Sequence, residues 1–194
     1  MTSSIRTKIL KKLYLLLPDL WVPSLSAVDF GELESRGIRG LLLDLDNTIV
    51  AWRAYDVPHA VKEWLAEAKK RGLKLCITSN TRSRKRLERL ASELNLQFVR
   101  GVIKPRRGGF IRAMEEIGTE PANTAVIGDQ VFTDVLGGNR IGLLTILVRP
   151  IDKKEFIGTK ISRLMEKAVF RWLQRHRCSG TIHSSITSES KDNI

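Results

Sequence analysis

Residues 40–48 read Gly-Leu-Leu-Leu-Asp-Leu-Asp-Asn-Thr, and this stretch decides the fold. A short apolar run leads directly into two aspartates, and such a run is typical of a parallel-sheet strand that helices cover on both faces. Residues i and i+2 of a strand point to the same face, and open parallel sheets bind ligands beyond the carboxyl ends of their strands. We therefore expect Asp44 and Asp46 to face one crevice.

The rest of the chain repeats this pattern. Short apolar segments alternate with amphipathic ones, which indicates βαβ units and hence an α/β, Rossmann-like fold whose parallel sheet is sandwiched by helices. We predict strands at Gly40–Leu45, Leu73–Ser79, Gln97–Arg100, Thr124–Gly128 and Leu143–Val148. Between them we predict helices at Pro58–Arg71, Ser83–Leu94, Gly108–Ile117 and Val131–Asn139.

Further polar residues follow the later strands. Asp129 and Asp134 come after an apolar run, in the sequence Gly-Asp-Gln-Val-Phe-Thr-Asp at residues 128–134. Ser79 closes another strand, and Lys104 lies in a basic loop. Clustered carboxylates need a cation, and hard oxygen ligands of this kind suit Mg²⁺. A hydroxyl and an ammonium group at neighbouring strand ends can hold phosphate oxygens. The pattern therefore predicts a divalent metal and a phosphate site together.

Taken in order, these motifs resemble the four motifs of the haloacid-dehalogenase-like (HAD) phosphohydrolase superfamily over about Ile38 to Pro150. The chain is more closely similar to the YqeG / mitochondrial phosphatidylglycerophosphatase family of subclass IIIA HAD phosphatases. The residues that carry this similarity are Leu16–Ser24, residues 40–48, Lys104-Pro105 and Val126–Arg140. Asn80-Thr81 departs slightly from the pattern expected after Ser79 but leaves that serine intact.

The resemblance implies a role for each matching residue. Asp44 would be the nucleophile that forms an aspartyl-phosphate, Asp46 the acid that then acts as base, and Lys104 a further catalytic residue. Asp134 would lie near the metal or orient Lys104. The implied Mg²⁺ ligands are Asp44, Asp46 through its backbone carbonyl, Asp129 and Asp134. The implied phosphate ligands are Asn47, Thr48, Ser79, Asn80 and Lys104.

The composition indicates an anionic partner. The chain has 194 residues and a formal net charge of +12, which favours binding to phosphate, nucleic acid or an acidic membrane surface. Cys76 and Cys178 cannot form a disulfide framework, so a reducing, cytoplasmic setting fits, with Cys76 as a small apolar core residue. No apolar run reaches the roughly 18–20 residues that span a bilayer. The basic N-terminus leaves an organelle presequence open.

The two ends of the chain differ from the centre. We expect a basic amphipathic helix at 1–20, the phosphatase core at 21–150, a second basic amphipathic helix at 151–178 and a disordered Ser/Thr-rich tail at 179–194. The two helices suit an anionic membrane surface, or they pack on the sheet. Within the core, we interpret most of Arg82–Arg89 as a solvated helix face, whereas Arg106 and Arg107 are placed to meet a substrate.

The spacing of the motifs bears on the substrate. The gap between Asp46 and Ser79 and the gap between Ser79 and Lys104 each leave room for about one helix and its connections. We therefore expect no large cap domain and an open site. An open site favours a substrate that is large or embedded in a membrane. Together with the resemblance, this predicts hydrolysis of phosphatidylglycerophosphate, an anionic phospholipid, by a protein peripheral to the inner membrane face. One alternative is the same chemistry on a phosphoprotein, a nucleic-acid end or a soluble phosphate ester. The other is a non-catalytic protein that binds nucleic acid or ribosomes, against which the complete set of site residues argues.

Overall fold

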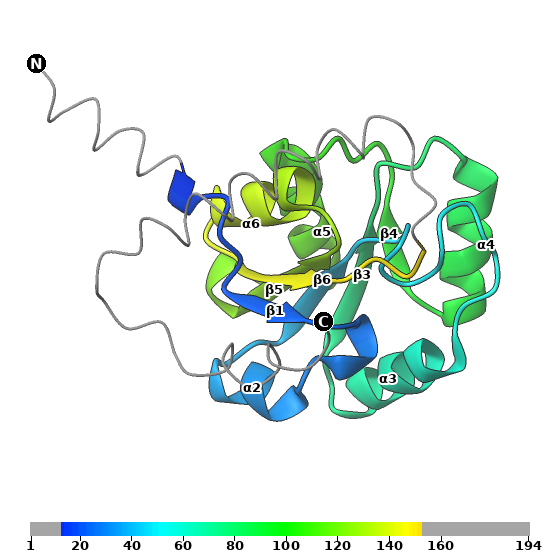
Figure 1. The fold of residues 1–194 in the computed structure, drawn as a ribbon, viewed down its shortest axis with the longest axis horizontal. Helices are drawn as coiled ribbons and strands as arrows, with labels where there is room; N and C mark the ends of the chain where they lie inside the picture. The colour runs from blue at the N-terminus through cyan, green and yellow to red at the C-terminus, as the bar shows by residue number, and fades with distance from the viewer. Residues whose placement is uncertain (1–12, 153–194) are drawn as a thin grey trace, which may run out of the picture. The chain divides into compact units, whose positions relative to one another are not determined.

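The structure is a computed structural model, and it describes residues 13–152 (Figure 1). The predicted C-terminal helix, the tail and most of the predicted N-terminal helix lie outside the described residues. Where that first helix enters the described part, it ends earlier than the expected range 1–20. Residues 13 and 14 are helical, residues 15–17 turn, and Leu20 already begins a strand. The physical reason is Pro18, because a proline disfavours helical geometry in the residue before it.

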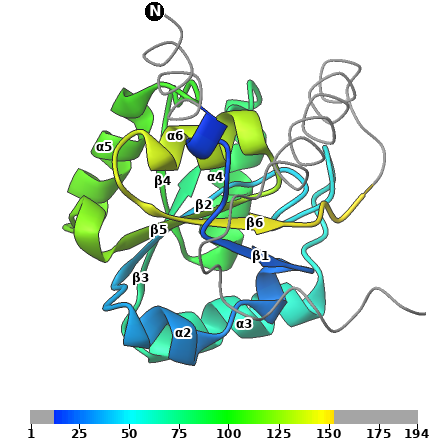
Figure 2. The ribbon, with the colours of Figure 1, turned by 60° about the vertical axis from the view of Figure 1, so that its left-hand side comes forward.

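The described residues form one parallel sheet of six strands in the order β1-β6-β5-β2-β3-β4 (Figure 2). The strands are β1 Leu20–Val22, β2 Gly40–Leu43, β3 Lys74–Thr78, β4 Gln97–Val99, β5 Thr124–Gly128 and β6 Leu144–Val148. Strand β2 lies between β3 and β5, and Leu43 is opposite Ile77 on one side and Ile127 on the other. The carboxyl ends of these three central strands therefore meet at one edge, where such sheets bind ligands.

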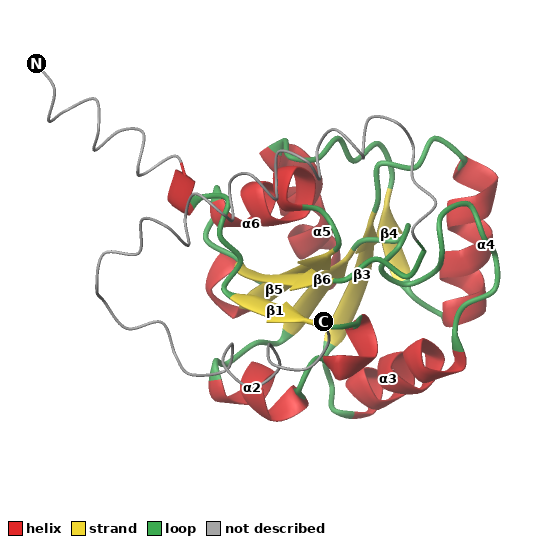
Figure 3. Cartoon of the chain, viewed as in Figure 1, coloured by secondary structure: helices red, strands yellow, loops and turns green. Residues whose placement is uncertain are grey.

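Helices cover both faces of the sheet (Figure 3). They are α2 Phe30–Ser35, α3 His59–Lys70, α4 Arg84–Leu94, α5 Arg107–Ile117 and the short α6 Leu136–Asn139. In this view and in Figure 2, α2 and α3 lie on one side of the sheet, and α5 and α6 lie on the other. The side chains of β2 alternate accordingly: Leu41 and Leu43 join the core under α2, α3 and α4, whereas Leu42 joins the core under α5. This arrangement confirms the predicted α/β fold.

Side-chain hydrogen bonds attach the edge strand β1 to the rest of the fold. We did not predict this strand from the sequence. The carboxylate of Asp19 accepts hydrogen bonds from the backbone N–H and the hydroxyl of Thr145 in β6, at 2.8 and 2.9 Å. The side-chain amide of Asn139 in α6 donates to the carbonyl oxygens of Leu15 and Leu17, at 2.9 and 2.8 Å. The Leu-Pro-Asp segment therefore has a structural role, because it fixes the chain along β6.

Two further elements differ from the predicted ones. The predicted helix Val131–Asn139 is divided into a π-helical turn, Val131–Val135, and α6. Helix α2 was not predicted; its six residues are capped by Asp29, whose carboxylate accepts a hydrogen bond from the N–H of Gly31 at 2.9 Å. The remaining helices and strands lie within two residues of their predicted ends. The π-helical turn matters for the site because it carries Asp134.

Candidate active site

Three segments bring charged side chains to the carboxyl edge of the sheet. Asp44 follows β2 directly, and its N–H still donates to the carbonyl of Ile127 in β5 at 2.9 Å. Asp129 follows β5, and Lys104 lies between β4 and α5. The strand register thus fixes the backbone of Asp44 beside β5, so that the segments after β2 and β5 share this edge.

Lys104 forms the centre of a buried ionic cluster. Its ammonium group contacts Oδ1 of Asp44 and lies 2.6 Å from Oδ1 of Asp134. The side chains of Lys104 and Asp134 are each only 2% exposed to solvent. Because charged groups so far from water are stable only with partners, the lysine and the two carboxylates depend on one another.

Burial and mutual charge shift the pKa values in this cluster. Burial raises the pKa of Asp44 to about 7, although the neighbouring Lys104 lowers it in part and Asp134 raises it further. At Lys104 burial opposes the charged form, but the carboxylates of Asp134 and Asp44 outweigh burial, and the pKa rises above its ordinary value. Lys104 is therefore a permanent cation in the site, and Asp44 needs positive charge beside it to stay ionised near neutral pH.

Gly128, the last residue of β5, makes room for Asp134. A Cβ atom at this position would lie 2.2 Å from Cγ and 2.7 Å from Cβ of Asp134, so rotating the Asp134 side chain would not remove the clash. The Asp134 carboxylate also accepts hydrogen bonds from the N–H of Gln130 at 3.3 Å and the hydroxyl of Thr133 at 3.2 Å. The turn after β5 thus folds Asp134 back onto the strand and aims its carboxylate at Lys104.

Three buried carboxylates lie close enough together to share one cation. Asp44, Asp129 and Asp134 each offer an oxygen atom, and these atoms lie within 4.8 Å of one another. Three carboxylates against the one ammonium of Lys104 leave the cluster with two negative charges in excess. Hard oxygen donors with this charge fit a divalent cation such as Mg²⁺, which commonly takes a few carboxylates and keeps several waters.

Asp46 flanks this cluster, where its charge also raises the pKa of Asp44, and its carboxylate makes two contacts through Oδ1. That oxygen lies 2.9 Å from Nη1 of Arg86 and accepts a hydrogen bond from the N–H of Arg53 at 3.2 Å. Strand β2 ends at Leu43, so the strand alternation that led us to expect Asp44 and Asp46 on one face does not reach Asp46. The side chain of Asp46 is 22% exposed. It therefore borders the buried cluster on the solvent side.

Asn47 and Thr48 continue the same loop. Asn47 adopts a left-handed backbone with φ of 64°, and its side-chain oxygen accepts hydrogen bonds from the N–H groups of Trp52 and Asp152, at 3.2 and 3.3 Å. The carbonyl end of this side chain thus holds the loop together. The hydroxyl of Thr48 is buried and has no hydrogen-bond partner within residues 13–152. Phosphate binding by both residues stays a prediction.

Ser79 and Asn80 follow β3 and reach the loop of Lys104. The side-chain oxygen of Asn80 accepts a hydrogen bond from the N–H of Lys104 at 2.8 Å, and its amide donates to the carbonyl of Lys104 at 3.4 Å. Asn80 thus helps to position the backbone of Lys104, and its predicted phosphate binding stays a prediction. Ser79 is buried, and its hydroxyl oxygen accepts from the N–H of Thr81 at 3.2 Å. That hydrogen bond does not use the hydroxyl proton, and phosphate binding by Ser79 stays a prediction.

The sequence analysis missed one residue of the site, Arg86. We interpreted its helix face as solvated, but Arg86 is 4% exposed. The available signal was its spacing: Arg86 lies four and eight residues before Leu90 and Leu94, which line the buried face of α4. A basic residue in register with that apolar face requires an internal partner, which is Asp46. Arg106 and Arg107, in contrast, are exposed, and their contact with a substrate stays a prediction.

Comparison with known proteins decides the family. The family model described as mitochondrial PGP phosphatase matches residues 2–152. The chain belongs to this family. A curated relative is the probable phosphatase YqeG of Bacillus subtilis, which is 36% identical over 166 residues, covering 86% of this chain and 95% of that protein. The predicted membership in the YqeG / PGP phosphatase family is confirmed.

One plant relative and one algal relative carry the name phosphatidylglycerophosphate phosphatase 1. The chloroplastic/mitochondrial protein of Arabidopsis thaliana is 26% identical over 183 residues, covering 86% of this chain and 51% of that protein. The chloroplastic protein of Chlamydomonas reinhardtii is 29% identical over 168 residues, covering 81% of this chain and 62% of that protein. Among solved structures, the cobalt-bound YrbI phosphatase of Haemophilus influenzae aligns with a TM-score of 0.46 and 14% identity over 70% of this chain and 89% of that one. The family assignment rests on the sequence matches.

Family membership makes this chain a HAD-type phosphatase, a phosphoric monoester hydrolase. This confirms the predicted enzyme class over the non-catalytic alternative. Between Asp46 and Ser79 the described chain holds α3 and β3, and between Ser79 and Lys104 it holds α4 and β4, without an inserted domain. Residues 13–152 contain no helix with the length and apolar character needed to cross a membrane.

Proposed function

We propose that this phosphatase depends on Mg²⁺, works through an aspartyl-phosphate on Asp44 and acts on phosphatidylglycerophosphate. The observation that carries the proposal is the buried cluster of Asp44, Lys104, Asp129 and Asp134 at the carboxyl edge of the sheet. In this cluster the proposed nucleophile Asp44 contacts the ammonium group of Lys104, and three carboxylates offer oxygen atoms to a second cation. Phosphoryl transfer depends mainly on such positioning and charge stabilisation.

Asp44, Asp129 and the backbone carbonyl of Asp46 are the proposed ligands of Mg²⁺. When bound, the ion would supply positive charge that stabilises the oxygens of the transferring phosphoryl group. Asp134 contacts Lys104 at 2.6 Å, which supports its proposed role in orienting the lysine. Lys104 and the hydroxyl of Ser79 are the proposed phosphoryl ligands contributed by side chains.

Two steps complete the reaction. An oxygen of Asp44 attacks phosphorus, the bond from phosphorus to the ester oxygen breaks, and Asp46 donates a proton to that oxygen, so that an alcohol leaves. In the second step Asp46 removes a proton from a water molecule, whose oxygen attacks phosphorus. The Asp44 carboxylate is released together with inorganic phosphate. Arg86 keeps Asp46 in a fixed position throughout, because the guanidinium lies 2.9 Å from Oδ1.

The lipid substrate is supported by the names of the relatives and by the surface around Lys104. Ile103 is 56% exposed and Ile151 is 40% exposed, although both are large apolar residues. Ile103 precedes Lys104, and Ile151 is bound to the active-site loop, because its N–H donates to the carbonyl of Asn47 at 3.1 Å. Exposed apolar residues beside basic ones suit the surface of an anionic membrane. We propose that the protein works as a peripheral enzyme on such a surface.

Phosphate release from phosphatidylglycerophosphate in anionic vesicles tests this proposal. We expect turnover with Mg²⁺ that stops on chelation, and no turnover by the variant Asp44→Asn, whose circular dichroism should show that it still folds. Turnover by Asp44→Asn would contradict the assigned nucleophile. Soluble phosphate esters hydrolysed as efficiently as the lipid, by a protein that does not sediment with the vesicles, would contradict the lipid substrate but not the chemistry.

A further inference from the structure

A tight turn next to Asp46 carries an exposed arginine. The N–H of Ala54 donates to the carbonyl of Ala51 at 2.9 Å, which closes the turn over residues 51–54. Within it Arg53 has φ of 58°, in the left-handed region that glycine adopts without steric cost. The arginine thus occupies a position whose backbone suits glycine, and such conformational strain is concentrated at functional sites.

The turn is fixed to Asp46 by a buried side chain. Nε of Arg86 donates to the carbonyl of Ala54 at 2.9 Å, and Nη2 donates to the carbonyl of Ala51 at 3.5 Å. The third nitrogen, Nη1, lies 2.9 Å from Oδ1 of Asp46. One guanidinium therefore joins both ends of the turn to the proposed general acid. The turn and Asp46 form a unit whose internal geometry helix α4 maintains.

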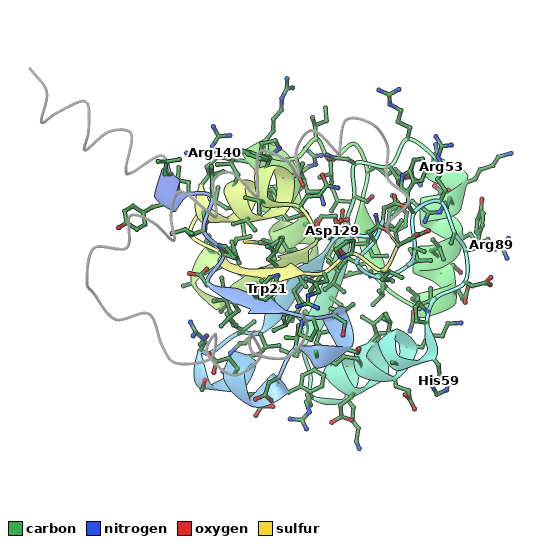
Figure 4. The ribbon with its side chains drawn as sticks, viewed as in Figure 1. Trp21, Arg53, His59, Arg89, Asp129 and Arg140 are labelled. Carbon is green, nitrogen blue, oxygen red and sulfur yellow. The ribbon has the colours of Figure 1, made fainter. Side chains whose placement is uncertain are left out.

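This unit places Arg53 where the leaving group of a substrate would lie. Asp46 donates its proton to the ester oxygen, so the departing alcohol must lie against Asp46 and the residues just beyond it. The N–H of Arg53 is 3.2 Å from Oδ1 of Asp46. Figure 4 shows Arg53 toward the periphery of the molecule, whereas Asp129 lies toward its middle. Arg53 is thus on the outward side of the reaction centre, along the path of the alcohol.

The side chain of Arg53 is suited to bind an anion there. Its guanidinium carbon lies 4.5 Å from the centre of the Trp52 ring. Stacking on an aromatic ring restricts the guanidinium while its N–H groups remain available in its own plane. Two parallel N–H groups match the oxygens of a phosphate group. Arg86, in contrast, directs its nitrogens to Asp46 and to the turn.

We propose that Arg53, stacked on Trp52, forms a second anion subsite that recognises a phosphodiester on the leaving alcohol. The inference rests on the proposed function, because the glycerol that leaves phosphatidylglycerophosphate carries such a diester. The subsite contacts no reacting atom, so it selects the substrate and leaves the chemical steps to Asp44 and Asp46. A soluble headgroup and a membrane lipid present the same diester, and the experiment separates these two sources.

The experiment compares two soluble substrates with the same scissile bond. The first is glycerol 3-phosphate, and the second is its analogue with a methyl phosphodiester on the far hydroxyl of the glycerol. The ratio of their kcat/KM values is measured for the full chain, for Arg53→Ala and for Arg53→Gly, with Mg²⁺ present. The control is Arg39→Ala, which removes one exposed positive charge at the opposite, amino-terminal end of β2. A parallel arm uses phosphatidylglycerophosphate in vesicles.

We expect the wild type and Arg39→Ala to prefer the diester analogue, and both Arg53 variants to lose about tenfold of that preference. Glycine suits the backbone at residue 53, so Arg53→Gly should keep at least the wild-type unfolding midpoint, which separates recognition from folding. An unchanged preference in both variants overturns the inference and leaves the proposed function standing. A loss of activity that the Arg53 variants show only with vesicles also overturns the inference, because such a loss indicates that Arg53 binds the membrane surface. A wild type that hydrolyses neither the lipid nor either soluble substrate overturns the proposed function, and the inference with it.

Discussion

Replacing Lys104 by methionine should show how much the stability of the protein depends on the charge balance of the buried cluster. Methionine keeps most of the length of the side chain but removes the ammonium group that contacts Asp44 and lies 2.6 Å from Asp134. Two carboxylates are then left buried side by side without their cation. Breaking a buried ion pair in this way costs about 3–5 kcal/mol, because the remaining charge stays desolvated.

The cost should depend on pH. Burial already raises the pKa of Asp44 to about 7, and Lys104 is one of the groups that lower it. Without Lys104 that pKa rises further, so Asp44 takes up a proton more readily in the folded than in the unfolded protein. A group of this kind makes the folded state less stable as pH rises. The stability deficit of Lys104→Met should therefore be largest at pH 8 and should shrink toward pH 5.

Urea denaturation followed by tryptophan fluorescence measures this deficit. The matched control is Lys62→Met, because Lys62 pairs with Glu93 at 2.8 Å with side chains that are 45% and 38% exposed. A solvent-exposed pair contributes less than about 1 kcal/mol, so this variant should remain close to the wild type at every pH. If Lys104→Met loses no more stability than Lys62→Met, or if its deficit is the same at pH 5 and pH 8, the account of the cluster is refuted.

Three further outcomes follow from the same geometry. Gly128→Ala should reduce kcat about a hundredfold and destabilise the protein by about 2 kcal/mol, because the added Cβ would lie 2.2 Å from Cγ of Asp134; wild-type kinetics and urea midpoint would contradict this. Burial raises the pKa of Cys76 to about 12. In the variant Cys178→Ser, where Cys76 is the remaining thiol, the folded protein should therefore resist a thiol reagent at pH 8 until denaturant is added. Rapid labelling of the folded variant would count against a buried Cys76. Because Asp44 must be deprotonated to bind a cation, calorimetry should show the affinity for Mg²⁺ falling about tenfold per pH unit below about 7; an affinity independent of pH would disagree.

The periodicity of the sequence was sufficient to predict the central sheet. Strands β2, β3 and β5 are near-continuous apolar runs because helices cover both of their faces, and this pattern is local. Strand β1 gives no such signal. It has three residues, and its stability comes from pairing with β6 and from the contact of Asp19 with Thr145, which are distant in sequence. Helix α2 is likewise too short to show a helical period.

The strand ends also predicted which residues meet at the site, but they did not predict how those residues are supported. Asp44, Asp129 and Asp134 do converge, since a parallel sheet directs the segments after its central strands to one edge. The sequence was less informative for Asn80 and Arg86. The family motif predicts that Lys104 binds phosphate, yet the hydrogen bonds between Asn80 and the backbone of Lys104 depend on how two loops pack together.

Arg86 shows what a linear pattern leaves out. Each basic residue between Arg82 and Arg89 has the same local chemistry, so net charge and composition treat them alike. Burial distinguishes Arg86, because its position on the apolar face of α4 takes its guanidinium out of water. A buried guanidinium must find oxygen partners, and those within reach are Asp46 and the turn that carries Arg53. The cost of burying one charge thus bears on the position of two others, Asp46 and Arg53, so the proposed leaving-group side of the site depends on a helix that lies outside its motifs.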